Sequence, residues 1–456
     1  MLNHIFKKTT IINVPVQRLF QWHERKGAVS RLTPPWIDIR LIHHTGGINV
    51  RAKVKFILKF FKISFVWKAE HIEYQKNKFF KDMQVKGPFA IWMHSHLFES
   101  HKKNQSVMED KVEFRLPFGI SGKIFLSLIQ KNLERVFAYR HRILKNDLEN
   151  QPEPQKKLTI LISGASGTLG SVIVPFLQTR GHRVIKLVRK KPVSSNDEVF
   201  WDPYNSELIL DDIRDIDAVI NLNGIDILGS RWTEKQKQKI SNSRTLPTSL
   251  LAEKIGSLDK KPRVFISSSA IGFYGQGGEK ELSEDSDAGN NFISRVCKSW
   301  EKASLNARNA GIRTVQIRIG IVLTPAGGAL KKMALPFKLG LGARISNGKQ
   351  YMSWISIDDV TGAINHILFD DSIQGPVNVC APNPVTNAEF TKELGRIFKR
   401  PAFFVIPEFA VKMIWGQMGE ETTLASARVC PGKLLKTGYK FRHTTLLQAL
   451  KHLLGR

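Results

Sequence analysis

Hydrophobic and polar residues follow two different patterns along the chain, and the change falls near residue 150. Before it, several short runs alternate. In 51–62, lysines separate apolar residues, which predicts a strand with one solvated, cationic face. A helical spacing of apolar residues follows at 124–137. From residue 158 to about residue 370, β-type apolar runs alternate with helical segments, which predicts a doubly wound parallel sheet of Rossmann type.

The segment 144–157 is polar, contains two prolines and has no periodicity, so it predicts a linker. We therefore expect a first domain at 1–145, a linker at 146–157 and an α/β domain at 158–400. A mostly helical extension is expected at 401–456, ending in the apolar pattern of 446–454. A chain of 456 residues is long enough for two or three domains.

A glycine loop joins the first strand of the α/β part, at 158–163, to the helix that follows. Its three glycines stand three residues apart. In this setting glycine permits a tight turn, close approach of backbone N–H groups to a pyrophosphate, and packing of the helix on the strand. We therefore predict a dinucleotide site whose loop residues are Gly164, Ser166, Gly167, Thr168, Leu169 and Gly170.

The residues after the second strand, at 181–189, favour one nicotinamide cofactor over the other. Many NAD sites place a carboxylate about 20 residues beyond the loop to bind the ribose 2′-hydroxyl. This chain has Arg189 and Lys190 there, followed by Lys191, and such cations pair with a 2′-phosphate. We expect NADP(H) rather than NAD(H). The alternative is a basic surface loop in a basic protein.

Three later strands are predicted at 217–224, 263–269 and 314–320. In open α/β sheets, ligands bind at the carboxyl ends of the strands. We therefore expect these strands to add four residues to the cofactor site, namely Asn223, Gly224, Ser267 and Arg318.

Residues 158–453 contain a series of motifs, namely Trp201-Asp-Pro203, Arg231-Trp-Thr233, Ser267-Ser-Ser-Ala-Ile-Gly-Phe-Tyr-Gly275, Ser353-Trp-Ile-Ser-Ile-Asp-Asp359, Pro376-Val-Asn378 and Pro431-Gly-Lys-Leu434. These motifs resemble those of the extended short-chain dehydrogenase/reductases, and more closely those of the atypical, epimerase-family oxidoreductases with a short C-terminal extension. The resemblance implies a Rossmann-type domain, an NAD(P) cofactor and a small-molecule substrate.

The first 142 residues contain a second set of motifs, namely Leu32-Thr-Pro-Pro-Trp36, Gly87-Pro-Phe89, Trp92-Met-His-Ser-His96, Met108-Glu-Asp110 and Phe137-Ala-Tyr-Arg-His141. They resemble motifs of the START-like polyketide cyclase/dehydrase and lipid-transport family. This resemblance implies a curved antiparallel sheet around a long C-terminal helix, with a cavity for an apolar ligand. Many aromatic residues from Phe20 to Phe114 fit such a lining, and a filled core or a docking face are the alternatives.

The catalytic pair of the reductase family is missing from this chain. Typical members use Tyr-x-x-x-Lys on one helix face, where Tyr is the acid/base and Lys lowers its pKa. The corresponding slot, 296–301, offers Cys297 and Glu301, or a Val and a Trp one residue earlier. Ser269 and Tyr274 are therefore the leading catalytic candidates, and Cys297 and Glu301 are weaker ones. A strand-end cap, a packed loop tyrosine and a buried apolar cysteine are the structural alternatives.

The net charge is +29, and residues 1–150, with 27 Lys and Arg against 12 Asp and Glu, are the more basic part per residue. No recognisable motif supports nucleic-acid binding. Contact with an anionic membrane surface stays open as a reason for the charge. Three cysteines, no secretory pattern and no apolar run long enough to span a bilayer favour the cytoplasm.

His94 and His96 stand two apart on a predicted strand, so both point to one face, and Asp110 follows. A metal site needs a further ligand of clear spacing, which the sequence does not reveal, so we expect no metal. Two functions remain. One is an NADP-dependent oxidoreductase or epimerase whose substrate is held or shielded by the first domain. The other is a cofactor-binding sensor or scaffold with little catalysis.

Overall fold

The structure is a computed structural model that describes residues 3–45, 47–60, 63–117, 125–150, 153–192, 197–210, 213 and 215–456. The chain divides into two compact units. The first comprises Met1–Lys157, Pro175–Gly181 and Leu454–Arg456, and the second comprises Leu158–Val174 and His182–Leu453. Among the described helices, none is long and apolar enough to cross a membrane.

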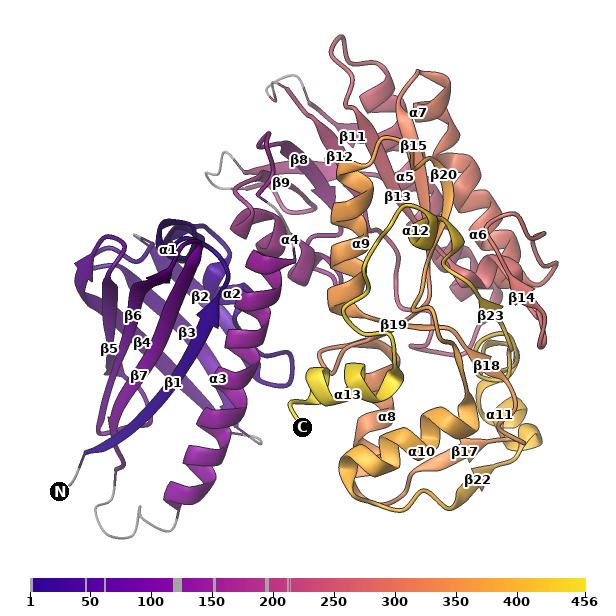
Figure 1. The fold of residues 1–456 in the computed structure, drawn as a ribbon. Helices are drawn as coiled ribbons and strands as arrows, with labels where there is room; N and C mark the ends of the chain where they lie inside the picture. The colour runs from indigo at the N-terminus through magenta and orange to yellow at the C-terminus, as the bar shows by residue number, and fades with distance from the viewer. Residues whose placement is uncertain are drawn as a thin grey trace. The chain divides into compact units, whose positions relative to one another are not determined.

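The first unit is built on one antiparallel sheet of seven strands, in the order β1-β7-β6-β5-β4-β3-β2 (Figure 1). The strands are β1 His4–Ile12, β2 Asp38–Thr45, β3 Lys53–Phe60, β4 Ile63–Gln75, β5 Phe79–Lys86, β6 Ile91–Lys102 and β7 Gln105–Arg115. The helices are α1 Val16–Glu24 and α2 Ala28–Arg31, between β1 and β2, and α3 Leu126–Glu149 after β7.

One face of this sheet is buried. Every second residue of β7 is buried, as expected for a strand with a covered face. Phe114 of β7 packs in one cluster with Leu133 and Phe137 of α3, so the long helix lies on this face. α3 continues to Glu149 and therefore takes in residues 146–149, which the sequence assigned to the linker. The segment is polar in sequence although Asp147 and Leu148 are buried, because the Asp147 carboxylate accepts a hydrogen bond from buried Arg31, with an Nε–Oδ2 distance of 2.8 Å.

The aromatic residues expected to line a cavity pack on one another. The ring centroids of Phe20 and Phe98 lie 5.1 Å apart, and those of Trp67 and Trp92 lie 5.2 Å apart. These are ordinary edge-to-face contacts of a filled interior. Phe61 lies outside the described residues.

The second unit contains the predicted doubly wound sheet, with eight strands in the order β11-β10-β9-β8-β12-β13-β15-β20. All neighbours are parallel except β10 and β11. The central strands are buried along nearly their whole length, because helices cover both faces (Figure 1). The strands are β8 Thr159–Ser163, β9 Arg183–Val188, β10 Glu198–Asp202, β11 Glu207–Leu208, β12 Ala218–Asn221, β13 Val264–Ala270, β15 Arg313–Ile319 and β20 Gly375–Val379.

Helices and short strand pairs complete this unit, and the strand pairs are β14–β23, β16–β19, β17–β22 and β18–β21. Their bounds are β14 Glu281–Leu282, β16 Ile321–Leu323, β17 Ala343–Ile345, β18 Tyr351–Met352, β19 Trp354–Ser356, β21 Val385–Thr386, β22 Phe404–Ile406 and β23 Arg428–Val429. The helices are α4 Gly170–Thr179, α5 Glu234–Gly256, η2 Ile271–Tyr274, α6 Phe292–Ala303, α7 Leu305–Asn309, α8 Gly328–Lys338, α9 Ile357–Phe369, α10 Asn387–Phe398, α11 Glu408–Trp415, η3 Gly419–Thr423, α12 Gly432–Lys436 and α13 Leu446–Leu454.

The C-terminal extension is woven into the second unit rather than forming a unit of its own. Its strand β22 pairs with β17, and β23 pairs with β14. The buried carboxylate of Asp359, at the start of α9, accepts hydrogen bonds from the backbone N–H groups of Arg442 (2.7 Å) and His443 (3.2 Å). The motif ending in Asp359 therefore fastens the C-terminal segment to α9.

Candidate cofactor and active site

The glycine loop follows β8 directly and uses each glycine differently. Gly164 has a left-handed backbone (φ +71°), and a Cβ there would stand 2.7 Å from the carbonyl oxygen of Leu222. A Cβ on Gly170 would stand 2.3 Å from the Gly164 carbonyl oxygen, so the start of α4 packs against the loop backbone. Gly167 has only one neighbour near its missing Cβ, the Gly164 oxygen at 3.2 Å. The open side of the loop is therefore at Gly167.

This loop fits the pyrophosphate of a dinucleotide. Ser166, Gly167 and Thr168 are exposed, while Leu169 is half-buried and Gly170 is buried. The first N–H groups of an α-helix have no partner within the helix, and the helix dipole favours an anion beside them. Gly327 lies close to the loop, because a Cβ there would stand 2.7 Å from Thr168 Oγ1.

A buried hydrogen-bond network ties together the carboxyl ends of β8, β12 and β13. Asn221 Oδ1 accepts hydrogen bonds from Ser163 Oγ (2.8 Å) and Asn223 Nδ2 (2.6 Å). Asn221 Nδ2 donates to Thr248 Oγ1 (2.7 Å) and Ser267 Oγ (3.2 Å). Of the expected cofactor residues, Asn223 is half-buried at this edge, whereas Ser267 is inside the network. The sequence analysis missed Asn221, although its position at the last residue of a buried strand could have indicated it.

Gly224 continues from this network with a φ of +151°. A Cβ on it would stand 3.2 Å from the guanidinium carbon of Arg244. Arg244 Nη2 donates to the Ile225 carbonyl oxygen (3.0 Å), which holds the turn after β12 against α5. Gly224 thus admits a close approach of two protein segments at the expected cofactor edge.

Arg189 and Lys190 are exposed immediately after β9. Lys191 lies over the Phe200 ring, with its Nζ 5.5 Å from the ring centroid. The pKa of Asp202 on the neighbouring strand is lowered, chiefly by the backbone N–H of Tyr204 and also by the charge of Arg189. Two exposed cations therefore follow the second strand of the sheet, where proteins of this fold bind the adenosine ribose.

The slot of the missing Tyr-x-x-x-Lys pair holds a different arrangement. Glu301 of α6 forms a two-pronged ion pair with Arg318 of β15, with Nε–Oε1 and Nη2–Oε2 distances of 2.9 Å. Ser269 Oγ at the end of β13 donates to Glu301 Oε1 (2.7 Å). Arg318 was expected to contact the cofactor, and the structure places it in the interior beside Glu301. Its partner identifies Glu301 as the central group of this cluster.

Tyr274 lies in the same cluster, with its hydroxyl group engaged. Its OH donates to Asn378 Oδ1 (2.6 Å) and accepts from Arg318 Nη1 (3.0 Å). Burial raises the pKa of Tyr274 to about 12, against the lowering effect of Arg318. The geometry favours the packed-tyrosine alternative over a proton donor to substrate.

Cys297 is buried on the inner face of α6 and packs with Ile293 and Val296. Burial, followed by the nearby charge of Glu301, raises the pKa of its thiol to about 12. A thiol is a poor nucleophile when it is not ionised. This favours the alternative of an inert, packed cysteine. Lys298, one residue further along, is exposed.

A polar cleft of about 890 Å³ opens beside these elements, within the second unit. It is bounded by the loop after η2, the start of α6, and the C-terminal elements α11 and η3. Glu421 of η3 accepts from the Ile293 N–H (3.0 Å) and so caps the first turn of α6. The polar and charged residues that line the cleft include Gln276, Asn291, Asn347, Lys349, Gln350, Lys412 and Glu420.

The strand order, the glycine loop and the ligand-binding edge define a Rossmann-type nucleotide-binding protein of the short-chain dehydrogenase/reductase class. Residues 160–380 match the model of the NAD dependent epimerase/dehydratase family, and residues 406–453 match DUF1731, a domain of unknown function. Epimerase family protein ML0860 of Mycobacterium leprae is 38% identical over 300 residues, which cover 66% of this chain and 97% of that protein. The chain belongs to the epimerase family.

Two solved structures extend the comparison. The nucleoside-diphosphate sugar epimerase from Corynebacterium glutamicum is 32% identical, with a TM-score of 0.82, over 99% of this chain and 90% of that chain. Human epimerase family protein SDR39U1, solved with NADPH, is 32% identical, with a TM-score of 0.60, over 65% of this chain and 99% of that chain. The chain is thus an epimerase-family, NAD(P)-binding protein. The START-like assignment of the first unit stays a prediction.

Proposed function

We propose that the chain is an NADP(H)-dependent oxidoreductase or epimerase that acts on a polar, hydroxylated small molecule. The observation that carries the proposal is the Ser269–Glu301–Arg318 cluster, which stands where the family places its Tyr–Lys pair. The glycine loop, Asn223 and Gly224 would hold the cofactor, which supplies the redox chemistry of its nicotinamide ring.

The preference for NADP(H) rests on Arg189 and Lys190. Each hydrogen bond to a charged group is worth about 1.5–3 kcal/mol, and 1.4 kcal/mol corresponds to a tenfold change in affinity. We therefore expect NADPH to bind at least roughly tenfold more tightly than NADH by calorimetry. Arg189→Ala should abolish the preference. Arg183→Ala, at the opposite end of β9, should keep it. Equal affinities in the unmodified protein would refute the proposal.

In the proposed reaction Ser269 contacts the substrate oxygen. When a substrate alcohol is oxidised, Ser269 Oγ takes up the alcohol proton while passing its own proton to the Glu301 carboxylate, so the number of protons is conserved. Arg318 is a positioning residue that holds Glu301 in place. The Corynebacterium relative is described as a nucleoside-diphosphate sugar epimerase, which supports a hydroxylated substrate. The polar cleft is lined by none of Ser269, Glu301 and Arg318, so the proposal does not rest on it.

The first substrate to test is UDP-glucose, together with NADP⁺ or NADPH. Absorbance measures the change in NADPH, and chromatography detects a change in the sugar. Ser269→Ala should lower the rate by about 10²–10⁴, the usual loss for a positioned proton-transfer group. Ser268→Ala is the matched control, because Ser268 is buried beside it and its Oγ has no hydrogen-bond partner among the described residues. An equal loss in both variants would count against a specific role for Ser269.

A second function is favoured by one observation, the hydrogen bonding of the polar side chains around Glu301 to one another. Tyr274, Glu301 and Arg318 already hydrogen-bond one another or their neighbours. A sensor or scaffold would bind NADPH normally and show no turnover with any sugar nucleotide tested. Normal binding together with turnover that depends on Ser269 would exclude it.

We further propose, on the START-like resemblance, that the first unit holds an apolar small molecule or lipid. The antiparallel sheet and the long helix α3 support this, and the packed rings oppose it. Saturable one-to-one binding of a fluorescent lipid to the full chain would support the proposal, and no binding would refute it.

We also propose a cytoplasmic location, which is consistent with three cysteines that are all unpaired. We further propose that the basic first unit contacts anionic membrane surfaces. Co-sedimentation of the chain with anionic vesicles tests this contact.

A further inference from the structure

The interior of the first unit contains a cluster of histidines and carboxylates that the cofactor site does not use. His94 and His96 of β6 point to the buried face of the sheet. Strand pairing sets Asp82 of β5 opposite His94, and Asp110 of β7 opposite His96. The two imidazoles therefore lie between two carboxylates, one from each neighbouring strand.

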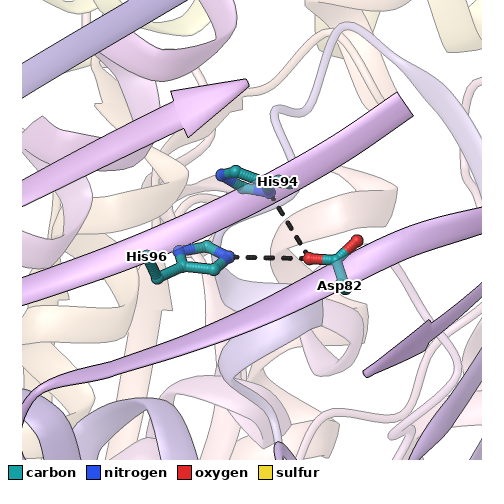
Figure 2. Close-up of side chains that lie close together, drawn as sticks. All are labelled: Asp82, His94 and His96. Carbon is teal, nitrogen blue, oxygen red and sulfur yellow. Dashed lines mark ion pairs between the residues drawn. The ribbon is translucent and has the colours of Figure 1, made fainter. Parts of the chain in front are cut away.

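On one side of the cluster, three atoms converge (Figure 2). His94 Nδ1 lies 3.6 Å and His96 Nε2 lies 3.9 Å from Asp82 Oδ2. These separations are too long for hydrogen bonds. Two ligand atoms that are each about 2.1 Å from one tetrahedral metal ion stand roughly 3.4 Å apart. The ligand atoms of the three residues all lie within 4.8 Å of one another. The spacing therefore suits one shared cation better than direct pairing.

On the other side, the Asp110 carboxylate lies behind the two imidazoles, where a histidine that binds a metal commonly donates its second ring N–H. His94 Nε2 donates to Asp110 Oδ1 (3.0 Å), and His96 Nδ1 lies 2.7 Å from the same oxygen without the alignment of a hydrogen bond. His141 of α3 binds the second oxygen, with an Nε2–Oδ2 distance of 2.8 Å. A carboxylate behind an imidazole fixes its tautomer and leaves the opposite nitrogen free for a metal.

Aromatic rings hold the two imidazoles in place. Phe80 stacks on His96 with ring centroids 4.1 Å apart, and Phe137 meets His94 edge-on at 5.3 Å. The site is not sealed, because 16% of the Asp82 side chain and 11% of the His96 side chain are exposed.

We propose that Asp82, His94 and His96 form a binding site for a divalent transition metal ion of the Zn²⁺ type. Two imidazoles and one carboxylate are ligands typical of such ions. Three protein ligands leave a fourth position for water or a small ligand, as in open zinc sites. Spacing along the chain did not reveal a third ligand, because Asp82 comes from a different strand, twelve residues before His94.

The test uses the full chain, free of any histidine tag and stripped of metal by a chelator. Titration with Zn²⁺ alone should show one bound equivalent per chain by calorimetry and by elemental analysis after dialysis. Co²⁺ should bind with the intense visible absorption of a tetrahedral site. Asp82→Asn and His96→Gln should each remove stoichiometric binding. Asp110→Asn should weaken the affinity roughly 10–100-fold, as expected for a residue that acts through the ligands.

His101→Gln is the matched control, because His101 lies on the same strand and is exposed. It should bind Zn²⁺ like the unmodified protein. Circular dichroism checks that each variant is folded. Should a ligand variant fail to fold, the stoichiometry and the Co²⁺ spectrum of the unmodified chain still decide the matter. Failure to bind one equivalent, or unchanged binding in folded Asp82→Asn and His96→Gln, would overturn the proposal.

Discussion

The ion pair between Glu301 and Arg318 gives the sharpest prediction for stability. Only 4% of the Arg318 side chain and 15% of the Glu301 side chain are exposed, and two 2.9 Å contacts join them. Burial alone would lower the pKa of the Arg318 guanidinium, yet its bonds to Glu301 raise that pKa. Replacing Glu301 with Gln therefore leaves a buried positive charge without its main partner.

Breaking one side of a buried ion pair typically costs about 3–5 kcal/mol. The partial exposure of Glu301 places this variant near the lower end of that range, at about 3 kcal/mol. Arg318 would keep its bonds to Tyr274 and to the Glu284 carbonyl oxygen, which limits the loss further. Removing both charges with Glu301→Gln and Arg318→Met should cost less than the sum of the single changes, because the second change removes the unpaired charge.

Differential scanning calorimetry of the full chain measures this effect. The two units can unfold separately, so the transition that NADPH shifts upward is assigned to the second unit. A loss of about 3 kcal/mol should lower the midpoint of that transition by about 5 °C, because the unfolding entropy of so large a unit is high. Lys298→Gln, an exposed position on the same helix, is the control and should leave the midpoint nearly unchanged.

A shift of less than about 1 °C for Glu301→Gln would show that water or rearrangement satisfies Arg318, and would refute the reasoning. A double variant with the full sum of both single losses would do the same, because it would mean that the two charges do not act as a pair.

Three other predictions concern the fold, the loop and pH. Asp359→Asn should weaken the hydrogen bonds from the backbone N–H groups of Arg442 and His443, each worth about 1.5–3 kcal/mol. Backbone amides of residues 437–453 should then exchange their hydrogens faster, and unchanged exchange there would contradict this. Gly170→Ala should weaken NADPH binding, measured by calorimetry, at least roughly tenfold, because its Cβ would stand 2.3 Å from the Gly164 carbonyl oxygen. Gly167→Ala should retain most of the affinity, because its Cβ would stand 3.2 Å from that oxygen. Burial, followed by the charge of His96, lowers the pKa of His23 to about 3 from 6.5, so only the unfolded chain gains this proton below pH 6.5. In denaturant titrations of the full chain, His23 should therefore contribute a loss of about 1.4 kcal/mol in the free energy of unfolding per pH unit on acidification below about pH 6.5, and His23→Gln should reduce the slope by that amount. Burial also lowers the pKa of His71, His94 and His96, so part of the slope should persist, whereas a slope unchanged by His23→Gln would contradict the prediction.

Local patterns were enough to predict the class of the second unit. A buried run, three glycines at fixed spacing and a helical segment require a particular backbone, and this requirement is met by residues that are neighbours in the chain. Because each central strand is buried on both faces, it appears in the sequence as an unbroken apolar run. The same local reasoning placed exposed Arg189 and Lys190 directly after β9.

The end of α3 and the C-terminal extension show where such reasoning stopped. The last turn of α3 is polar, so its residues could not be told from a linker. β22 and β23 contain only three and two residues, and each is held by a partner strand far away in the chain. Segments this short carry no usable periodicity of their own.

The sequence by itself therefore determined the Rossmann-type architecture, the glycine loop and the cations beside it, since each depends on contiguous residues. Only the tertiary structure decided which distant side chains meet. It paired Glu301 with Arg318, engaged the hydroxyl of Tyr274, and brought Asp82 to His94 and His96. Pairing between strands and the packing of helices on them create these contacts, and no spacing along a single chain segment encodes such a pairing.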